Sequence, residues 1–429
     1  MNIPNIWATN VSAPRSHTHR LQPLFGKKHQ SSRSVTANPD GPDKILVTTF
    51  RESLSDGGTG RMIINFLNGL PREAFTQDLV TLSDTSHYQH EVPGYIQSHV
   101  LEIPYLRERA AAFFAVLPLA RHLKRTRPDI LVVHSARANF IALLAVILSR
   151  SRTKVVIVQH MHHSPLVRLP FRFFKGWLYR RFARALYRRA DHFVGVSDGV
   201  ADNIRNIFGV PERKITTIFN PVVREELFAQ ARAPLDHPWF AGGQTPVVLA
   251  VGRLVEIKDF ITLIRAFAKV RSRIDSRLVI LGEGPEEKKL REEVKSLGLN
   301  DSVQFLGFEA NPYRYMSRAA VLVLSSLSEA LPTVLIEALA CGCPVVSTDC
   351  PTGPREILEG GKWGRLVTVA RPDELAGAIL STLTAEIGAN KSRRADSFSV
   401  ARSVASYTKL FKKLLDHDSQ QKRPMSAGL

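Results

Sequence analysis

Short apolar runs recur along the chain and divide it into two halves of similar pattern. They are rich in valine, isoleucine and leucine, and longer segments with helical periodicity separate them. In the first half the runs lie at residues 45–50, 79–82, 130–134, 155–159 and 193–196, and in the second at 247–251, 278–281, 303–306, 321–324 and 345–348. Strands that alternate with helices are typical of parallel sheets. The pattern therefore predicts two doubly wound, Rossmann-like α/β domains that face each other across a cleft.

Composition marks the boundaries of these domains. Residues 1–40 contain no acidic side chain before Asp40 and lack periodicity, which is typical of a disordered tail and also of an organelle transit peptide. Proline and glycine concentrate at residues 234–246 and interrupt the alternation. We expect a basic extension at 1–40, an N-terminal domain at 41–235, a linker at 236–246, a C-terminal domain at 247–395, a helix at 396–417 and a tail at 418–429.

The predicted C-terminal helix carries an apolar stripe. The stripe consists of Tyr407, Leu410, Phe411 and Leu414, which recur at helical spacing. Because such a stripe is normally buried, we expect this helix to pack back across both domains.

Charge and cysteine content limit the function classes. The chain has 429 residues, and 58 basic against 39 acidic residues leave a formal charge of +19. This charge implies an anionic partner, which is nucleic acid, an anionic membrane or a phosphorylated substrate. Three cysteines form neither a disulfide framework nor a complete Cys-based metal site, so a reducing compartment is expected. The longest apolar run, residues 140–148, is shorter than the roughly 18 residues of a membrane span.

Residues 166–189 combine basic and aromatic side chains and contain no acidic residue. Such a helix suits the interface of an anionic membrane, where rings insert at headgroup level and basic groups contact phosphates. An ordinary domain helix with buried rings and solvated arginines is the alternative. RNA binding is a third interpretation, although no recognition motif accompanies the charge. We expect a peripheral protein on the cytoplasmic face of the membrane, without nucleic acid as a partner.

Two carboxylates lie in and just before a predicted helix at residues 332–341. Pro332 suits the first helical position, and Gly342 followed by Pro344 ends the helix. Glu337 lies within an otherwise uncharged run, and Glu329 lies in the loop that leads to the helix N-terminus, where anions are favoured. This arrangement predicts a polar ligand across the helix start. The structural alternative is that Glu337 is simply exposed and Glu329 caps the helix.

Other candidate ligand contacts follow predicted strands. Arg253 and Lys258 come after the strand at 247–251, where two cations suit a diphosphate. Gly57 and Gly58 belong to a glycine loop that opens a helix after the first strand, which suits close approach to a phosphate or sugar, although a plain connecting turn is equally compatible.

A histidine also lies at a predicted strand end. His160 follows the run at 155–159, which places it at the expected cleft, and His134 is a weaker candidate at another strand end. The neighbours His162 and His163 suggest a metal, but no cysteine or carboxylate cluster completes a zinc set around them. A strand-end histidine can also serve only as a hydrogen-bonded structural residue.

Several motifs together resemble those of the retaining GT-B glycosyltransferases of family 4, over about residues 44–415. The matching residues in the second half are Glu329 and Glu337 with Leu331 and Pro332 between them, Gly252 to Leu254 with Lys258, Gly282 to Pro285, Phe305 to Gly307, and Cys350 to Ile357. Those in the first half are Gly57, Gly58, Ala190, Asp191, Val196, Ser197, Asn220 and Pro221.

The resemblance implies a role for each candidate residue. Arg253 and Lys258 are expected to hold the donor diphosphate, Glu337 the ribose, and Glu329 the transferred sugar. His160 matches a histidine that lies near the sugar and the acceptor. Leu331, Pro332 and Thr333 are expected to complete the donor site with Gly57 and Gly58. Ala330 departs from the family, which usually has glycine there, so a positive φ at this position would disturb donor binding.

We therefore predict transfer of a sugar, with retention, from a nucleotide diphosphate sugar, expected to be UDP-linked, to a glycan or lipid-linked acceptor in cell-envelope synthesis. No cofactor is expected. The phosphate is expected to be held without a divalent ion, because the one Asp-x-Asp sequence, Asp416 to Asp418, lies in the tail. One alternative is a nucleotide-sugar epimerase or a phosphorolytic enzyme on the same fold. Another is a basic module that binds membrane or nucleic acid without transfer activity.

Overall fold

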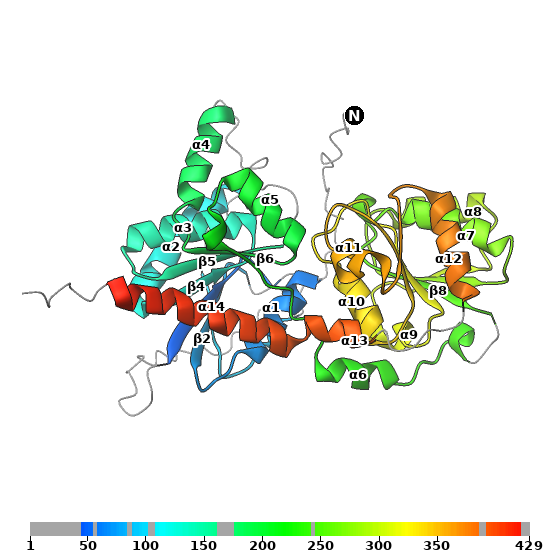
Figure 1. The fold of residues 1–429 in the computed structure, drawn as a ribbon, viewed down its shortest axis with the longest axis horizontal. Helices are drawn as coiled ribbons and strands as arrows, with labels where there is room; N and C mark the ends of the chain where they lie inside the picture. Colours follow the sequence, from blue (N-terminus) through cyan, green and yellow to red (C-terminus); the bar gives the residue numbers. More distant parts are fainter. Residues whose placement is uncertain are drawn as a thin grey trace, which may run out of the picture. The chain divides into compact units, whose positions relative to one another are not determined.

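The computed structural model describes residues 44–54, 58–83, 88–101, 108–160, 176–241, 245–385 and 392–421. The predicted extension at 1–40, Gly57, and residues 166–175 of the predicted membrane segment lie outside these ranges. Figure 1 shows the order of strands and helices along the chain. No helix of the described part is both long and apolar enough to cross a membrane.

The first half of the chain forms a seven-stranded parallel sheet with strand order β3-β2-β1-β4-β5-β6-β7. Its strands are β1 (Ile45–Phe50), β2 (Phe75–Thr81), β3 (Gln97–Val100), β4 (Ile130–Val133), β5 (Lys154–Gln159), β6 (His192–Gly195) and β7 (Ile215–Thr217). The helices that alternate with them are α1 (Gly58–Gly69), α2 (Glu108–Thr126), α3 (Ala136–Ser149), α4 (Gly176–Tyr187), α5 (Asp198–Phe208) and α6 (Glu225–Arg232).

The second half forms a six-stranded parallel sheet with order β10-β9-β8-β11-β12-β13. Its strands are β8 (Val247–Val251), β9 (Arg277–Leu281), β10 (Val303–Phe305), β11 (Val321–Leu324), β12 (Val345–Thr348) and β13 (Arg365–Val367). Its helices are α7 (Phe260–Arg271), α8 (Glu287–Ser296), α9 (Tyr313–Met316), α10 (Thr333–Ala340), α11 (Pro354–Ile357) and α12 (Pro372–Leu383), and α13 (Ser392–Ala395) and α14 (Val400–Gln421) follow.

These two sheets confirm the predicted α/β architecture. All strands are parallel, but the strand order reverses between β1 and β4 in the first sheet and between β8 and β11 in the second, because successive strands are added on opposite sides of these pairs. At such a switch point the loops after neighbouring strands diverge, so the carboxyl ends of those strands are open to a ligand. Residues that follow β1, β4, β8 and β11 are therefore in the positions that this fold gives to binding sites.

Helix α14 packs on the first sheet through the predicted stripe. Tyr407, Leu410 and Phe411 are buried, and the ring centroids of Phe66 in α1 and Tyr407 are 4.9 Å apart. Gly69, at the end of α1, permits this close packing, because an added Cβ would lie 2.6 Å from Val400 Cγ1. The helix begins at Val400, a few residues later than expected, and continues to Gln421.

Candidate active site

The loop between β11 and α10 is held by two hydroxyl groups of its own and by the hydroxyl of Thr352, which follows β12. The Ser325 hydroxyl donates to the Lys258 carbonyl at 2.9 Å, and the Ser326 hydroxyl donates to Glu329 Oε1 at 2.6 Å. Thr352 Oγ1 donates to the Glu329 carbonyl at 2.5 Å. Pro332 is the N-cap of α10 and makes no side-chain capping bond, so the first N–H groups of the helix stay available to an anion.

This loop brings two predicted donor residues together. Lys258 ends the short helix η5 (Glu256–Lys258), and its Nζ lies 2.5 Å from Glu329 Oε1. The two side chains are 21% and 12% exposed, so the pair is shielded from water on most sides. The structural alternative for Glu329 is therefore wrong, because its carboxylate pairs with a lysine and does not cap α10.

The residues after Glu329 lead into helix α10. Leu331 and Pro332 are buried in the loop, and Thr333 begins α10, in agreement with the predicted helix at 332–341. Gly353, with φ +87°, presses on this loop, since an added Cβ would lie 2.6 Å from Pro332 Cδ. Ala330 is not among the described non-glycine residues with positive φ, so alanine causes no backbone strain there.

The N-terminus of α1 faces that of α10. An added Cβ at Gly58 would lie 3.5 Å from Thr333 Oγ1, so backbone from the first half of the chain approaches the start of α10. Each helix N-terminus carries a partial positive charge and unpaired N–H groups. Two such termini beside Lys258 make this region attractive to an anionic ligand.

Arg253 reaches the same edge of the second sheet. It follows β8 in a loop that packs tightly, because a Cβ on Gly282 would collide with the Gly252 carbonyl oxygen and one on Gly284 with the Leu254 backbone. The Arg253 side chain is exposed and makes no ion pair within the described residues. The glycines at 282 and 284 therefore position this loop, a structural task that the motif alone did not reveal.

Glu337 lies among groups from both halves of the chain. The Tyr313 hydroxyl bonds to its carboxylate, and Arg61 of α1 and Arg224 lie near enough to attract its charge. Burial raises the pKa of Glu337 to about 7, although both arginines oppose this rise. The alternative of a simply exposed glutamate is wrong, because the residue is half-buried. Arg61, Arg224 and Tyr313 were missed by sequence reasoning, since none belongs to a strand end or a motif.

His160 forms a pair with His134 at the carboxyl edge of the first sheet. The distance from His134 Nδ1 to His160 Nε2 is 3.0 Å, and the two residues follow β4 and β5. Burial, with a smaller contribution from Arg51, lowers the pKa of His160 to about 3, and burial lowers the pKa of His134 well below its ordinary value. Both rings are therefore neutral at pH 7.

The surroundings of His134 indicate which of the two histidines donates the hydrogen bond between them. His134 Nε2 is buried and has no hydrogen-bond partner in the described part of the chain. A buried N–H without a partner is rarer than an unpaired acceptor, which favours a proton on His134 Nδ1. His134 would then donate to His160 Nε2, so the free proton of His160 lies on Nδ1. The Nδ1–H of His160 is then the donor that this hydrogen bond leaves unused.

A further acid in this region was not predicted. Glu52 follows β1, and its Oε2 accepts a hydrogen bond of 2.5 Å from Ser135, the N-cap of α3. Because it follows a strand at the switch point of the sheet, the topology was the signal that could have identified it. Glu52, His134 and His160 therefore surround the carboxyl ends of three neighbouring strands.

Glu356 links the motif after β12 to the first half of the chain. Its carboxylate accepts hydrogen bonds from the backbone N–H groups of Asp198 at 2.6 Å and Gly199 at 3.0 Å, at the start of α5. A carboxylate at a helix N-terminus is favoured by the helix dipole. Burial raises the pKa of Glu356, and the two N–H groups oppose that rise. This contact gives Glu356 of the motif a structural role.

The described part of the predicted membrane segment is divided between core and surface. Tyr187 is buried and stacks on Phe208 with ring centroids 4.4 Å apart. Phe182 is 52% exposed beside the exposed Arg181. The described part of α4 is therefore neither purely a membrane-surface helix nor purely a domain helix with buried rings.

Two parallel doubly wound sheets, with basic groups and helix N-termini at their carboxyl edges, define the GT-B class of α/β proteins. The chain belongs to the glycosyl transferases of group 1. The family model of that description matches residues 236–397, and the model described as Glycosyltransferase Family 4 matches residues 56–226. The GT-B fold and the glycosyltransferase family that the motifs indicated are thereby confirmed, and glycosyltransferases of this group take nucleotide-sugar donors.

Relatives with known names support this assignment. The N-acetylgalactosamine-N,N'-diacetylbacillosaminyl-diphospho-undecaprenol 4-alpha-N-acetylgalactosaminyltransferase of Campylobacter jejuni is 30% identical over 339 residues, which cover 78% of this chain and 89% of that protein. The lipopolysaccharide core biosynthesis glycosyltransferase LpsE of Rhizobium meliloti is 27% identical, with 76% and 85% covered. The structure of Anabaena HepE in complex with UDP and glucose superposes with a TM-score of 0.68 at 21% identity, covering 86% of this chain and all of that one.

Proposed function

We propose that this glycosyltransferase moves a sugar from a UDP-sugar to a glycan or lipid-linked acceptor in cell-envelope polysaccharide or glycolipid synthesis, with retention of configuration. The observation that carries the proposal is the Lys258–Glu329 pair at the start of α10, beside the N-terminus of α1. It joins a cation, a carboxylate and two helix N-termini, a combination that suits a sugar attached to a diphosphate.

In this proposal residues 247–395 bind the donor. The diphosphate lies at the N-terminus of α10 and is neutralised by Lys258 and the exposed Arg253, while Glu337 accepts hydrogen bonds from the ribose. Glu329 accepts a hydrogen bond from the transferred sugar, and its pairing with Lys258 supports a position between sugar and phosphate. Leu331, Pro332, Thr333, Gly57 and Gly58 complete the donor site. The HepE complex with UDP and glucose supports a uridine nucleotide.

The transfer step needs charge stabilisation at the leaving group. The bond from the sugar C1 to the diphosphate oxygen breaks, and a bond from C1 to the acceptor oxygen forms on the same face of the sugar. The acceptor hydroxyl proton passes to the diphosphate oxygen that leaves. Lys258, Arg253 and the N-terminus of α10 stabilise the negative charge that develops there. The pKa of His160 is lowered to about 3, which makes its ring a weak base, so in this proposal His160 orients the sugar or the acceptor through its N–H group and does not take the proton.

The acceptor is assigned to residues 41–235. The Campylobacter jejuni relative is named for transfer to a diphospho-undecaprenol saccharide and for an alpha linkage, which supports a lipid-linked acceptor. An α-linked product from an α-linked nucleotide donor is the retaining outcome. Such an acceptor is held in a membrane, so the protein would work as a peripheral enzyme on the cytoplasmic face.

The surface near α4 supports this location. Phe182 is exposed on α4 next to the exposed Arg181, and Ile147 and Leu148 are exposed at the end of α3, which Arg150 and Arg152 follow in the sequence. An apolar surface beside basic side chains suits the headgroup region of an anionic membrane. Residues 166–189 are the proposed contact segment.

Transfer assays with UDP-sugars test the reaction. The full-length protein is incubated with UDP-glucose, UDP-galactose, UDP-N-acetylglucosamine or UDP-N-acetylgalactosamine and an undecaprenyl-diphosphate saccharide, and the release of UDP is measured. We expect acceptor-dependent release with one donor, an α-anomer by NMR, and a loss of about 100-fold or more in Lys258→Ala. The matched control Lys288→Ala, exposed on α8, should keep full activity. Donor isomerisation without an acceptor, or a β-linked product, would contradict the proposal.

Vesicle sedimentation tests the membrane contact. The protein should sediment with phosphatidylglycerol vesicles and not with phosphatidylcholine vesicles, and Phe182→Ala should weaken this binding. Phe228→Ala is the matched control, because Phe228 is an exposed phenylalanine on α6. Equal binding to both kinds of vesicle would argue against an anionic surface as the partner.

A further inference from the structure

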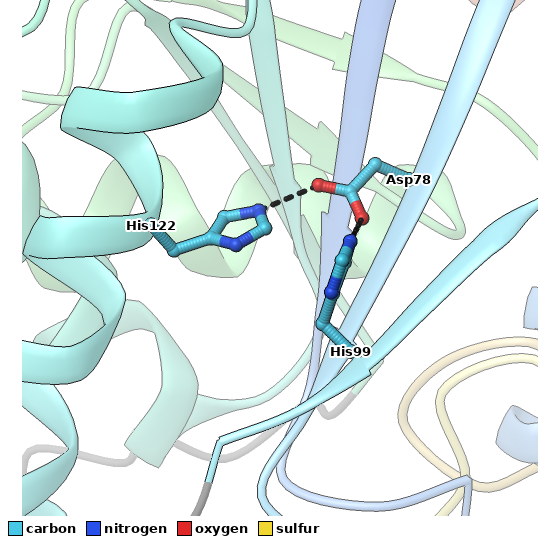
Figure 2. Close-up of side chains that lie close together, drawn as sticks. All are labelled: Asp78, His99 and His122. Carbon is cyan, nitrogen blue, oxygen red and sulfur yellow. Dashed lines mark hydrogen bonds and ion pairs between the residues drawn. The ribbon is translucent and has the colours of Figure 1, made fainter. Parts of the chain in front are cut away.

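Three side chains that commonly bind metals meet on the first sheet. Asp78 comes from β2, His99 from β3 and His122 from α2, and Figure 2 shows both imidazole rings directed at the carboxylate. His122 Nε2 lies 2.6 Å from Asp78 Oδ2, and His99 Nε2 lies 3.3 Å from Asp78 Oδ1. One ligand atom from each residue lies within 4.8 Å of the other two. Their nitrogen and oxygen atoms thus converge on one point.

The Asp78 carboxylate is buried, and only one of its oxygens is hydrogen-bonded. Its side chain is 5% exposed, and Oδ2 accepts a hydrogen bond of 3.1 Å from Thr48 in addition to the contact with His122. Oδ1 is buried and has no hydrogen-bond partner within the described residues, although it faces the His99 ring. A buried carboxylate oxygen without a partner is costly. This oxygen is directed at His99 Nε2, and the other carboxylate oxygen is directed at His122 (Figure 2).

We propose that Asp78, His99 and His122 form a zinc site that joins α2 to β2 and β3. Two imidazole nitrogens and one carboxylate oxygen are ligands that zinc accepts, and water can fill the fourth position. His99 lies on the edge strand and is 32% exposed, so an ion and its water reach the site from the sheet edge. Zinc binds each Nε2 only when that nitrogen carries no proton. A neutral ring therefore keeps its one proton on Nδ1, and a doubly protonated ring releases its Nε2 proton to solvent, so both histidines bind as neutral imidazoles.

The site is separate from the candidate active site. Asp78 pairs with Thr48 inside the sheet, whereas Glu52, His134 and His160 follow the ends of their strands. The three ligands come from three different elements, β2, β3 and α2, and within the described residues β3 pairs only with β2. An ion there would stabilise the attachment of the edge strand and of α2, without taking part in transfer.

Zinc binding by the full-length protein tests this site. The protein is treated with EDTA, dialysed against zinc chloride alone, passed over a desalting column and analysed for bound zinc. We expect His99→Gln to retain one zinc fewer per chain than wild type, with affinity lowered by more than about tenfold. The matched control His90→Gln removes an exposed histidine from η1 (Gln89–Glu91) and should bind as wild type does. The comparison of His99→Gln with His90→Gln corrects for zinc that other histidines of the chain bind.

Two further measurements distinguish a metal site from a hydrogen-bonded cluster. Zinc should raise the melting temperature of wild type and of His90→Gln but not of His99→Gln. Cobalt should give visible d–d absorption in wild type that is lost in Asp78→Asn, which keeps the shape of the buried side chain. Equal zinc retention by wild type and His99→Gln, or no zinc retained by wild type, would overturn the proposal. If Asp78→Asn does not fold, His99→Gln decides alone, because it alters a partly exposed residue on an edge strand.

Discussion

Replacement of Glu337 by glutamine should make the protein more stable in alkaline solution. Burial favours the protonated carboxyl group and raises the pKa of Glu337 from an ordinary value of 4.5 to about 7. The native state therefore holds a proton that the unfolded chain has released between these two values. The contribution of the Glu337 carboxyl group to the free energy of unfolding is fully present below pH 4.5. It is lost as the pH rises through the native-state pKa of about 7. Glutamine resembles the protonated form and avoids this loss.

The magnitude follows from the difference between the two pKa values. At about 1.4 kcal/mol for each pH unit, the full difference corresponds to about 3 kcal/mol. Water at the half-buried carboxylate screens part of the effect, so a gain of about 1 to 3 kcal/mol is expected at pH 8.5. The same change should remove most of the transfer activity, because the proposed ribose contact needs a charged acceptor.

Urea unfolding of Glu337→Gln and wild type at pH 5 and pH 8.5 measures this difference. The urea midpoint of the variant should exceed that of wild type at pH 8.5 and approach it at pH 5. Glu292→Gln is the control, because Glu292 is exposed on α8 and has no ion pair in the described part of the chain. If both variants behave alike, or if Glu337→Gln is less stable at pH 8.5, the stated effect of burial is refuted.

Three other predictions concern contacts that the tertiary structure creates. NMR of histidine-labelled protein should show that the His160 ring does not titrate between pH 5 and 8, since its pKa is lowered to about 3, and a titration near pH 6 assigned with His160→Gln would contradict this. Glu356→Ala removes the acceptor of two backbone N–H groups in α5 and should lower the free energy of unfolding by about 1 to 2 kcal/mol; no change in the urea midpoint would show that water replaces the contact. Gly69→Ala should lower it by about 1 to 3 kcal/mol through overlap with Val400 and Val404, while Gly94→Ala, with nothing within 4 Å of its added Cβ, should be neutral in the same assay.

The central strands could be predicted from the sequence because they are buried on both faces. Such strands appear as continuous apolar runs, and β1, β8, β11 and β12 begin and end at the predicted residues. The edge strands β3, β7 and β13 were missed, because they are short and carry exposed polar side chains. The start of β2 was also missed, since Gln77 and Asp78 are polar residues inside a buried strand.

Part of the candidate site could be predicted because its residues are neighbours along one strand–loop–helix unit. The spacing of Glu329 and Glu337 about the start of α10 is a local property, and so is the position of Lys258 after β8. Local sequence and helix signals are sufficient to place such residues, but they do not identify the residues that approach from other elements.

Only the tertiary structure decided which residues meet. Lys258 and Glu329 are 71 residues apart in the sequence, and His134 and His160 are 26 residues apart. Asp78, His99 and His122 share no motif spacing and come together only because β2, β3 and α2 pack against one another. The sequence by itself determined the two α/β halves and the strand–loop–helix unit around α10, since hydrophobic period and helix signals are local. The pairings across elements, and the pKa values that result from their burial, depend on how the sheets and helices pack.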